Sequence, residues 1–249
     1  MKKILLICVT YHSDKELQTF LESVHRAAEQ VTKKMQIDVE VVNNDLHNAG
    51  YMGGALPIYN RCAKNYDFAI ISNVDIVLAE NFFIELNNQP VDGIGWIVPR
   101  IYSACRDTEE NPQAVHRYSK SKIQLLRFLY AHPNLYCLYR NSVHKLTQLR
   151  RNNKNNIERN MDIYAGNGSF FLFTQAFVQQ NIPLQYPCFL YGEEIYFAEL
   201  VRKSGLRTVF MPNLYIENKT PNVSTGSLGI KGRCAYSQQA MDYLLKTFY

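Results

Sequence analysis

Two groups of acidic residues predict group-transfer chemistry. The pair Glu193–Glu194 follows Gly192 and begins a segment with helical periodicity, while Asp75 follows a short apolar run. A carboxylate at the end of a strand in an α/β protein is well placed to hold a metal ion or a phosphate. A carboxylate that opens a helix can accept a proton. Together these acids indicate transfer of a group from an activated phosphate ester.

The elements that position these acids alternate between strand and helix patterns. Residues 4–9, 37–42 and 68–72 are apolar runs of the kind found in buried strands, and residues 17–31 have apolar side chains at helical spacing. Strand, helix and strand in this order predict a parallel βαβ unit. Each strand ends in polar residues, which would therefore gather at one edge of the sheet.

The later segments are bounded by glycine and proline. We expect a helix over residues 58–63 with Pro57 in its first turn, after a glycine-rich segment that lets backbone approach a ligand. A second helix is expected over residues 193–204, ended by Gly205. Pro212 is expected to end a strand over residues 208–211.

Length and composition favour one globular α/β domain. The chain has 249 residues and no Pro/Gly/Ser-rich linker. Its six cysteines show no CxxC spacing, which argues against a zinc finger. No run approaches the roughly 18 apolar residues of a membrane span, and no signal peptide is recognisable. The expected location is therefore cytoplasmic.

Positive charge is concentrated in one region. The net charge is +5, and the cations between residues 117 and 159 are Arg117, Lys120, Lys122, Arg127, Arg140, Lys145, Arg150, Arg151, Lys154 and Arg159. Residues 150–156 are polar and basic, so a loop is expected there. One interpretation of this region is a solvated insert without a function of its own. The other is a surface that makes peripheral contact with an anionic membrane, such as the inner membrane face.

Four segments in order resemble a known family. Residues 7–11, 48–54, 73–78 and 189–194 resemble motifs of the family 2 glycosyltransferases of the GT-A fold, particularly bacterial rhamnosyltransferase-like members. The resemblance covers most of the chain except about residues 102–161. It implies a Rossmann-like mixed sheet flanked by helices, a single domain over residues 1–249 and a basic insert at 102–161.

The resemblance also implies an activity and its partners. The activity is inverting transfer of a sugar from a nucleotide-diphosphate sugar to a glycan or lipid-linked acceptor, in bacterial surface polysaccharide synthesis. No nucleic acid is expected as a partner. The alternatives are a nucleotidyltransferase-like enzyme, which would have no use for the pair of acids, and a non-catalytic module that binds membrane or nucleic acid through the basic insert.

By resemblance, Asp75 is the metal-binding acid of a DxD-type motif whose first acid is replaced by Asn73. The cofactor would be Mg²⁺ or Mn²⁺. Asn218 stands nearest to the position of a metal-contacting His, and Lys219 beside it is placed to neutralise a diphosphate. The alternative for Asp75 is an acid that caps the next loop.

Glu194 takes the position of the family's catalytic base, with Glu193 as the second candidate because Glu is longer than the usual Asp. The alternative is that both acids only stabilise the helix N-terminus through its dipole.

The nucleotide-binding residues are also implied by the resemblance. The backbone of Thr10 and Tyr11 would contact the base, and Asn43 or Asn44 would read the base or ribose. Gly53 and Gly54 would lie near the ribose and diphosphate. The alternative for these glycines is a tight turn and close helix packing.

Overall fold

The structure is a computed structural model that describes residues 1–150, 157–219 and 228–249. Residues 151–156, where the sequence predicts a loop, lie outside the described range, as do Arg151 and Lys154 of the basic region.

The N-terminal part of the chain alternates strands and helices, as predicted. Its elements are β1 (Lys2–Thr10), α1 (Asp14–Glu29), β2 (Met35–Asn43), α2 (Tyr51–Cys62), a 3-10 helix (Ala63–Asn65), β3 (Phe68–Asn73), β4 (Ile76–Leu78), α3 (Phe82–Asn88) and β5 (Ile94–Ser103). β1 pairs in parallel with both β2 and β3, which confirms the predicted parallel pairing. The carboxyl ends of these strands therefore meet at one edge of the sheet.

The remainder of the chain completes the sheet and adds helices. Its elements are β6 (Thr108–Glu109), α4 (Lys120–Ala131), α5 (Pro133–Arg150), β7 (Met161–Ile163), β8 (Phe170–Thr174), α6 (Gln175–Asn181), α7 (Glu193–Lys203), β9 (Arg207–Asn218) and α8 (Ile230–Phe248). The nine strands of the described residues form one mixed sheet in the order β2-β1-β3-β8-β5-β9-β4, with β6 on β5 and β7 on β9.

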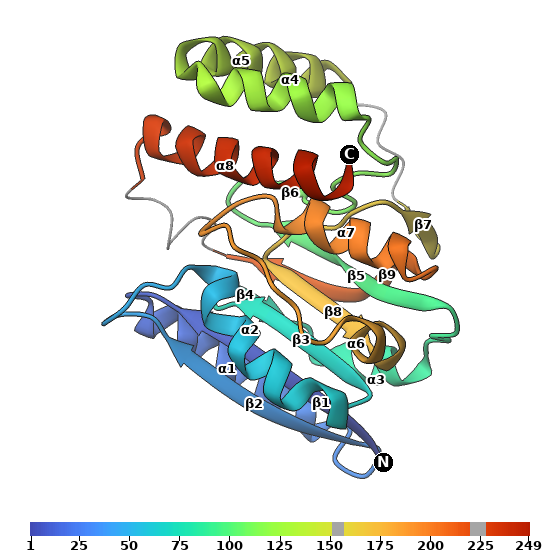
Figure 1. The fold of residues 1–249 in the computed structure, drawn as a ribbon. Helices are drawn as coiled ribbons and strands as arrows, with labels where there is room; N and C mark the ends of the chain where they lie inside the picture. Colours follow the sequence, from blue (N-terminus) through green and yellow to red (C-terminus); the bar gives the residue numbers. More distant parts are fainter. Residues whose placement is uncertain (151–156, 220–227) are drawn as a thin grey trace.

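The sheet separates two hydrophobic clusters (Figure 1). Alternation along β1 sends Ile4 and Leu6 toward the cluster that contains α1 and α3, and Leu5 and Ile7 toward the cluster that contains α2, α6 and α7. Beyond α7 lie α8 and then the α4–α5 hairpin, which forms the outermost layer at the end of the molecule away from β2. This arrangement confirms the predicted mixed sheet flanked by helices.

Two predicted boundaries are wrong. Helix α2 begins at Tyr51 and not after Pro57, so the glycine-rich segment forms its first turn and Pro57 lies inside the helix. Strand β9 continues past Pro212 to Asn218, because a bulge absorbs the proline: Met211 pairs with Pro99, and the next pair joins Tyr215 to Arg100. The predicted stop of α7 is confirmed by Gly205, whose φ is 69°.

Candidate functional site

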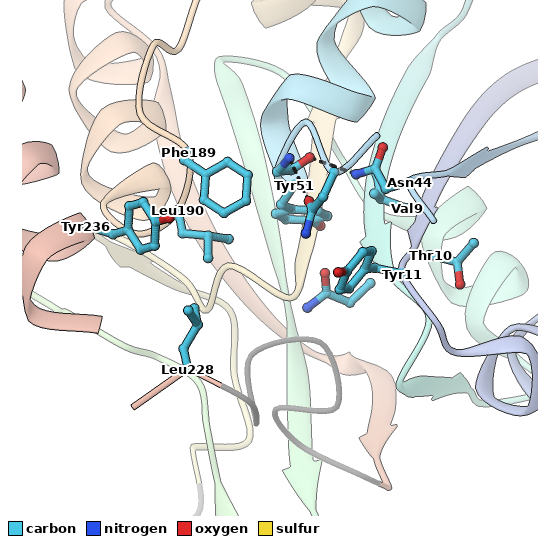
Figure 2. Close-up of a pocket in the computed structure, with 12 residues that line it drawn as sticks. Val9, Thr10, Tyr11, Asn44, Tyr51, Phe189, Leu190, Leu228 and Tyr236 are labelled. Atoms are coloured by element: carbon cyan, nitrogen blue, oxygen red, sulfur yellow. Dashed lines mark hydrogen bonds between the residues drawn. The ribbon is translucent and has the colours of Figure 1, made fainter. Parts of the chain in front are cut away.

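Two adjoining cavities lie at the carboxyl ends of β1 and β3. The first, of about 250 Å³, is bounded by the end of β1 and the start of α2 on one side and by Phe189 and Leu190 on the other (Figure 2). The second has a volume of about 210 Å³. Tyr51, Asn73 and Leu190 line both cavities, so a ligand that fills the first can extend into the second.

The first cavity has aromatic and amide walls. None of the described residues that line it is charged. The rings of Phe189 and Tyr236 are tilted by 40° with their centroids 5.1 Å apart, and Tyr11 lies across the cavity from them (Figure 2). Thr10 contributes a buried Oγ1 that has no hydrogen-bond partner among the described residues, and the Asn44 amide donates to the Gly50 carbonyl at 3.0 Å. Ring faces and uncharged polar groups suit a planar heterocycle.

The second cavity is strongly acidic. Four carboxyl groups line it, from Asp75, Glu110, Glu193 and Glu194, together with the guanidinium of Arg106. Arg106 pairs with Glu110 at 3.4 Å. Because like charges at close range disfavour one another's ionisation, such a cavity favours bound cations and retained protons.

Strand pairing brings Asp75 and Asn218 together. Asn218 at the end of β9 lies opposite Ile76 in β4, and the Lys219 amide donates to the Asp75 carbonyl at 3.2 Å. The Asn218 side chain is only 4% exposed, yet its Oδ1 has no hydrogen-bond partner among the described residues. A buried acceptor on a residue that lines the same cavity as Asp75 is suited to a cation.

The oxygen atoms of this cavity fit a hard divalent cation. Within the described ranges, no group of three or more His, Cys, Asp or Glu side chains is close enough to hold a metal on its own. Carboxylate and amide oxygens are nevertheless the ligands that Mg²⁺ and Mn²⁺ prefer, with water or phosphate oxygens completing the shell. Asp75 and the unpaired Oδ1 of Asn218 are therefore the candidate protein ligands.

Glu193 and Glu194 have different environments although they are neighbours. Burial raises the pKa of Glu193 and the charge of Glu194 raises it further, although hydrogen bonds with the backbone at Glu193 and Tyr191 lower it in part. Burial also raises the pKa of Glu194, but hydrogen bonds from its own amide, from the Gly168 amide and from the Gln113 side chain oppose that shift. Glu193 is 6% exposed, whereas Glu194 is half-buried. Glu194 is therefore the member of the pair that ionises first.

A strained turn fixes the start of α7. Tyr191 and Gly192 both have positive φ, of 71° and 85°. The Tyr186 hydroxyl donates to the Tyr191 carbonyl, and a Cβ on Gly192 would lie 2.8 Å from the Tyr186 oxygen. Left-handed backbone at a non-glycine residue persists only where surrounding contacts hold it. The turn thereby sets the direction in which Glu193 and Glu194 enter the cavity.

Three solved structures that align with this chain are glycosyltransferases. The catalytic domain of Drosophila β1,4-galactosyltransferase 7 with xylobiose aligns with a TM-score of 0.52 at 12% identity, over 94% of this chain and 80% of that one. GalNAc-T7 with UDP, GalNAc and Mn²⁺ aligns with 0.56 at 13%, over 98% of this chain and 48% of that one. The mannosyltransferase PcManGT from Pyrobaculum calidifontis, in complex with GDP-Man and Mn²⁺, aligns with 0.51 at 10%, over 90% and 59%.

The chain has the GT-A fold. No protein-family model matches the sequence. A comparison with curated protein sequences also finds no match. At these identities the likeness is one of fold, and the roles of residues must be argued from the site itself.

Within this GT-A domain, some predicted residues do not line the cavities. Asn43 is exposed, and its Oδ1 accepts from the Asp45 amide at 2.7 Å, so of the two candidates only Asn44 faces the first cavity. Gly53 and Gly54 lie within α2. A Cβ on Gly54 would lie 3.1 Å from the Asn44 side chain, which indicates close helix packing.

Lys219 is also outside the two cavities. It is exposed and lines a separate shallow hollow with Lys15, on which Asp75 also borders. Thr10, Tyr11, Asn73, Asp75, Asn218, Glu193 and Glu194 do line one or both cavities.

The GT-A domain also brings in residues that the sequence analysis did not single out. Arg106, Glu110 and Asn167 line the acidic cavity, and Gly168 lies against Glu194. Residues 106–113 belong to the region expected to be a basic insert, and the structure places Arg106, Glu110 and Gln113 at the acidic cavity or at Glu194 beside it. The residues Glu109, Glu110 and Asn111 form a polar run after β5 that could have indicated it.

The rest of the basic region forms the α4–α5 hairpin. Buried Ile123 and Leu129 belong to the side of α4 that packs on α8. Large apolar side chains remain exposed along the hairpin, namely Leu125, Phe128, Leu135, Leu138 and Val143. Among the described residues, no helix is both long enough and apolar enough to cross a membrane.

Proposed function

We propose that the chain is a glycosyltransferase that moves a sugar from a nucleotide-diphosphate sugar to an acceptor hydroxyl, with inversion at the anomeric carbon. The observation that carries this proposal is the direct junction of an uncharged aromatic cavity with an acidic one through Tyr51, Asn73 and Leu190. The first cavity suits a nucleobase, and the second suits a diphosphate–cation unit beside a proton acceptor. The GT-A fold supports the same function.

The reaction needs one proton acceptor. The acceptor hydroxyl oxygen forms a bond to the anomeric carbon, the bond from that carbon to the diphosphate oxygen breaks, and the hydroxyl proton passes to a carboxylate. Glu194 is the proposed base, because it ionises before Glu193 and is the less buried of the two. Glu193, which keeps its proton to higher pH, would position the acceptor.

The leaving group carries negative charge that must be stabilised. Asp75 and the amide oxygen of Asn218 would hold a Mg²⁺ or Mn²⁺ ion. When bound, the ion supplies positive charge that stabilises the departing diphosphate. Arg106, on the same cavity, adds a fixed cation near that position.

The setting follows from the family resemblance and from the hairpin. We propose transfer to a glycan or lipid-linked acceptor in bacterial surface polysaccharide synthesis, at the cytoplasmic face of the membrane. Exposed Phe128 and Leu138, together with the exposed cation Arg140 of the same hairpin, support peripheral contact with anionic lipid.

A turnover assay distinguishes the candidates. The protein is incubated with UDP-, dTDP- and GDP-sugars, each with Mg²⁺ or Mn²⁺, and the released nucleotide is separated by chromatography. A glycosyltransferase releases a nucleoside diphosphate, and Glu194→Gln should slow that release. Exchange of pyrophosphate, unaffected by Glu194→Gln, would instead identify a nucleotidyltransferase. Absence of both turnover and nucleotide binding would leave only the binding-module alternative.

A further inference from the structure

Glu110 accepts hydrogen bonds from two asparagine side chains in the acidic cavity. Its Oε2 receives Nδ2 of Asn218 at 3.2 Å and Nδ2 of Asn167 at 3.3 Å. The Glu110 side chain is 8% exposed, so these contacts are largely shielded from solvent. Both amide groups must therefore turn their NH₂ side toward the same carboxylate.

This contact decides the orientation of the Asn218 amide. A carboxylate paired with an arginine only accepts hydrogen bonds, and an asparagine amide has a donor side and an acceptor side. The reverse orientation would set Oδ1 of Asn218 against Oε2 of Glu110, oxygen to oxygen. The orientation in the structure instead leaves Oδ1 buried on a cavity-lining residue, without a partner among the described residues.

Glu110 is itself held on several sides. Its backbone amide donates to the Ile101 carbonyl at 2.8 Å, and Arg106 pairs with its Oε1. The second donor, Asn167, is also fixed, because its Oδ1 accepts from the Ser169 amide at 2.8 Å. The Glu110 carboxylate that orients Asn218 is therefore held in place, because Glu110 itself and its second donor Asn167 each form a hydrogen bond with the backbone.

We infer that Glu110 is a positioning residue that presents the amide oxygen of Asn218 to a divalent cation. Its role rests on the proposed function, in which Asp75 and Asn218 hold that cation. Asparagine is a weaker ligand than histidine or a carboxylate, and its oxygen is useful only when the amide is held in one orientation. Glu110 supplies that restraint without contacting the cation itself.

The experiment measures metal and nucleotide affinity separately. Calorimetry gives the affinity of wild-type protein and Glu110→Ala for Mn²⁺ in saturating UDP, and for UDP without metal. GDP replaces UDP if the wild type prefers it. Glu110→Ala should bind Mn²⁺ about 10- to 100-fold more weakly, the range usual for residues that orient ligands. Its affinity for UDP without metal should not fall, because the variant removes a negative charge from the cavity proposed for the diphosphate and frees Arg106. Glu109→Ala, at the neighbouring acid outside the cavity lining, is the matched control and should keep wild-type Mn²⁺ affinity.

Two further variants separate positioning from direct ligation. If Glu110 acts through Asn218, the losses in Glu110→Ala and Asn218→Ala should not add in the double variant. Circular dichroism checks that each variant retains its fold.

Each unfavourable result has a separate meaning. Wild-type Mn²⁺ affinity in Glu110→Ala, or additive losses in the double variant, would overturn the positioning role and leave the glycosyltransferase proposal intact. A wild-type protein that binds nucleotide but no Mn²⁺ would overturn the metal assignment and the positioning role together.

Discussion

Gly168 lies directly against the carboxylate of Glu194. A Cβ atom on Gly168 would be 2.7 Å from Oε1 of Glu194 and 3.0 Å from its Cδ, and the Gly168 amide donates a hydrogen bond to the same group. The backbone before β8 thus both fixes the carboxylate and favours its ionised form. No larger residue can make this approach without moving Glu194.

The first prediction tests this contact. Gly168→Ala should displace the Glu194 carboxylate and lower sugar transfer by at least about tenfold, since proton acceptance requires hydrogen-bond distance. Affinity for a nucleoside without phosphates should stay near wild type, because Gly168 lines the second cavity and not the first. Initial rates and calorimetry provide the two measurements. Gly232→Ala is the control: its Cβ would meet only Leu228 Cδ2 at 3.6 Å, an ordinary contact. Unchanged transfer in Gly168→Ala would show that Glu194 need not hold this position.

The second prediction concerns the pair of acids. Glu194→Gln keeps the size of the side chain and removes the proton acceptor, so transfer should fall by about 10² to 10⁴ while the nucleotide sugar still binds. Glu193→Gln should be milder, because a protonated Glu193 and a glutamine both donate hydrogen bonds. Single-turnover rates with a saturating donor make the comparison. The reverse order of losses would exchange the two roles.

The third prediction is a pH dependence of stability. The pKa of Glu193 is raised above its ordinary 4.5 by burial and by the charge of Glu194. Between pH 4.5 and the raised pKa, the folded chain holds a proton that the unfolded chain has lost. Stability therefore falls as pH rises through this window, and below it no penalty exists. Glu193→Gln should flatten this decline in urea titrations between pH 4 and 9.

Glu199 provides a control, because its effect on stability should change with pH in the opposite direction. Burial alone would raise its pKa, but hydrogen bonds from Arg117, Tyr164 and Arg202 outweigh that effect and lower it. The stability that its charge contributes is complete above its ordinary pKa and is lost as pH falls through the lowered value. Glu199→Gln should therefore destabilise the protein at neutral pH and have less effect in acid. Parallel pH profiles for the two variants would contradict both assignments.

The fourth prediction compares two glycines at the start of α2. Gly50 has a φ of 78°, and a Cβ there would be 2.3 Å from the Phe189 carbonyl oxygen. Gly50→Ala should lower the melting temperature and weaken nucleotide binding. A Cβ on Gly53 would meet the Cβ of exposed Ala49 at 3.3 Å, a tight contact that opposes the helix propensity of alanine, so Gly53→Ala should change stability by less than about 1 kcal/mol. Loss of nucleotide binding in Gly53→Ala at unchanged melting temperature would instead support a ligand contact at Gly53.

The fifth prediction concerns the α4–α5 hairpin. Phe128 and Leu138 are 53% and 66% exposed. Replacing both with serine should reduce sedimentation with anionic vesicles, and raising the salt concentration should reduce it in the wild type. Leu46→Ser, at a 93% exposed leucine in another part of the fold, is the control. Equal binding by all variants would remove the hairpin from membrane contact.

The strand ends are the part of the site that local patterns could predict. Thr10, Asn73 and Asp75 each follow an apolar run, and parallel pairing places the ends of β1 and β3 at one edge. Glu193 was recognisable because it follows a glycine and opens a periodic segment. Each of these residues is indicated by its neighbours in the chain, so a single sequence is enough to predict it.

The remainder depends on long-range pairing. Glu110 acts on Asn218 across 108 positions of the sequence, a separation that no local pattern encodes. Asn44 and Asn43 are adjacent and chemically identical, and only the turn geometry decides which one faces the cavity. Pro212 predicted a strand end, since proline cannot donate a ladder hydrogen bond. The bulge that accommodates it is visible only in the pairing with β5.

That bulge makes the site sensitive to insertions and deletions. Pro212, Asn213 and Leu214 lie between two paired positions of β9 and have no counterparts on β5. If the unpaired stretch kept its length, deleting one of them would move the following pairs by one residue and bring Lys219 opposite Ile76 in place of Asn218. A cation would then stand where the amide oxygen is now. The number of residues in this stretch, more than their identity, decides which side chain the acidic cavity receives.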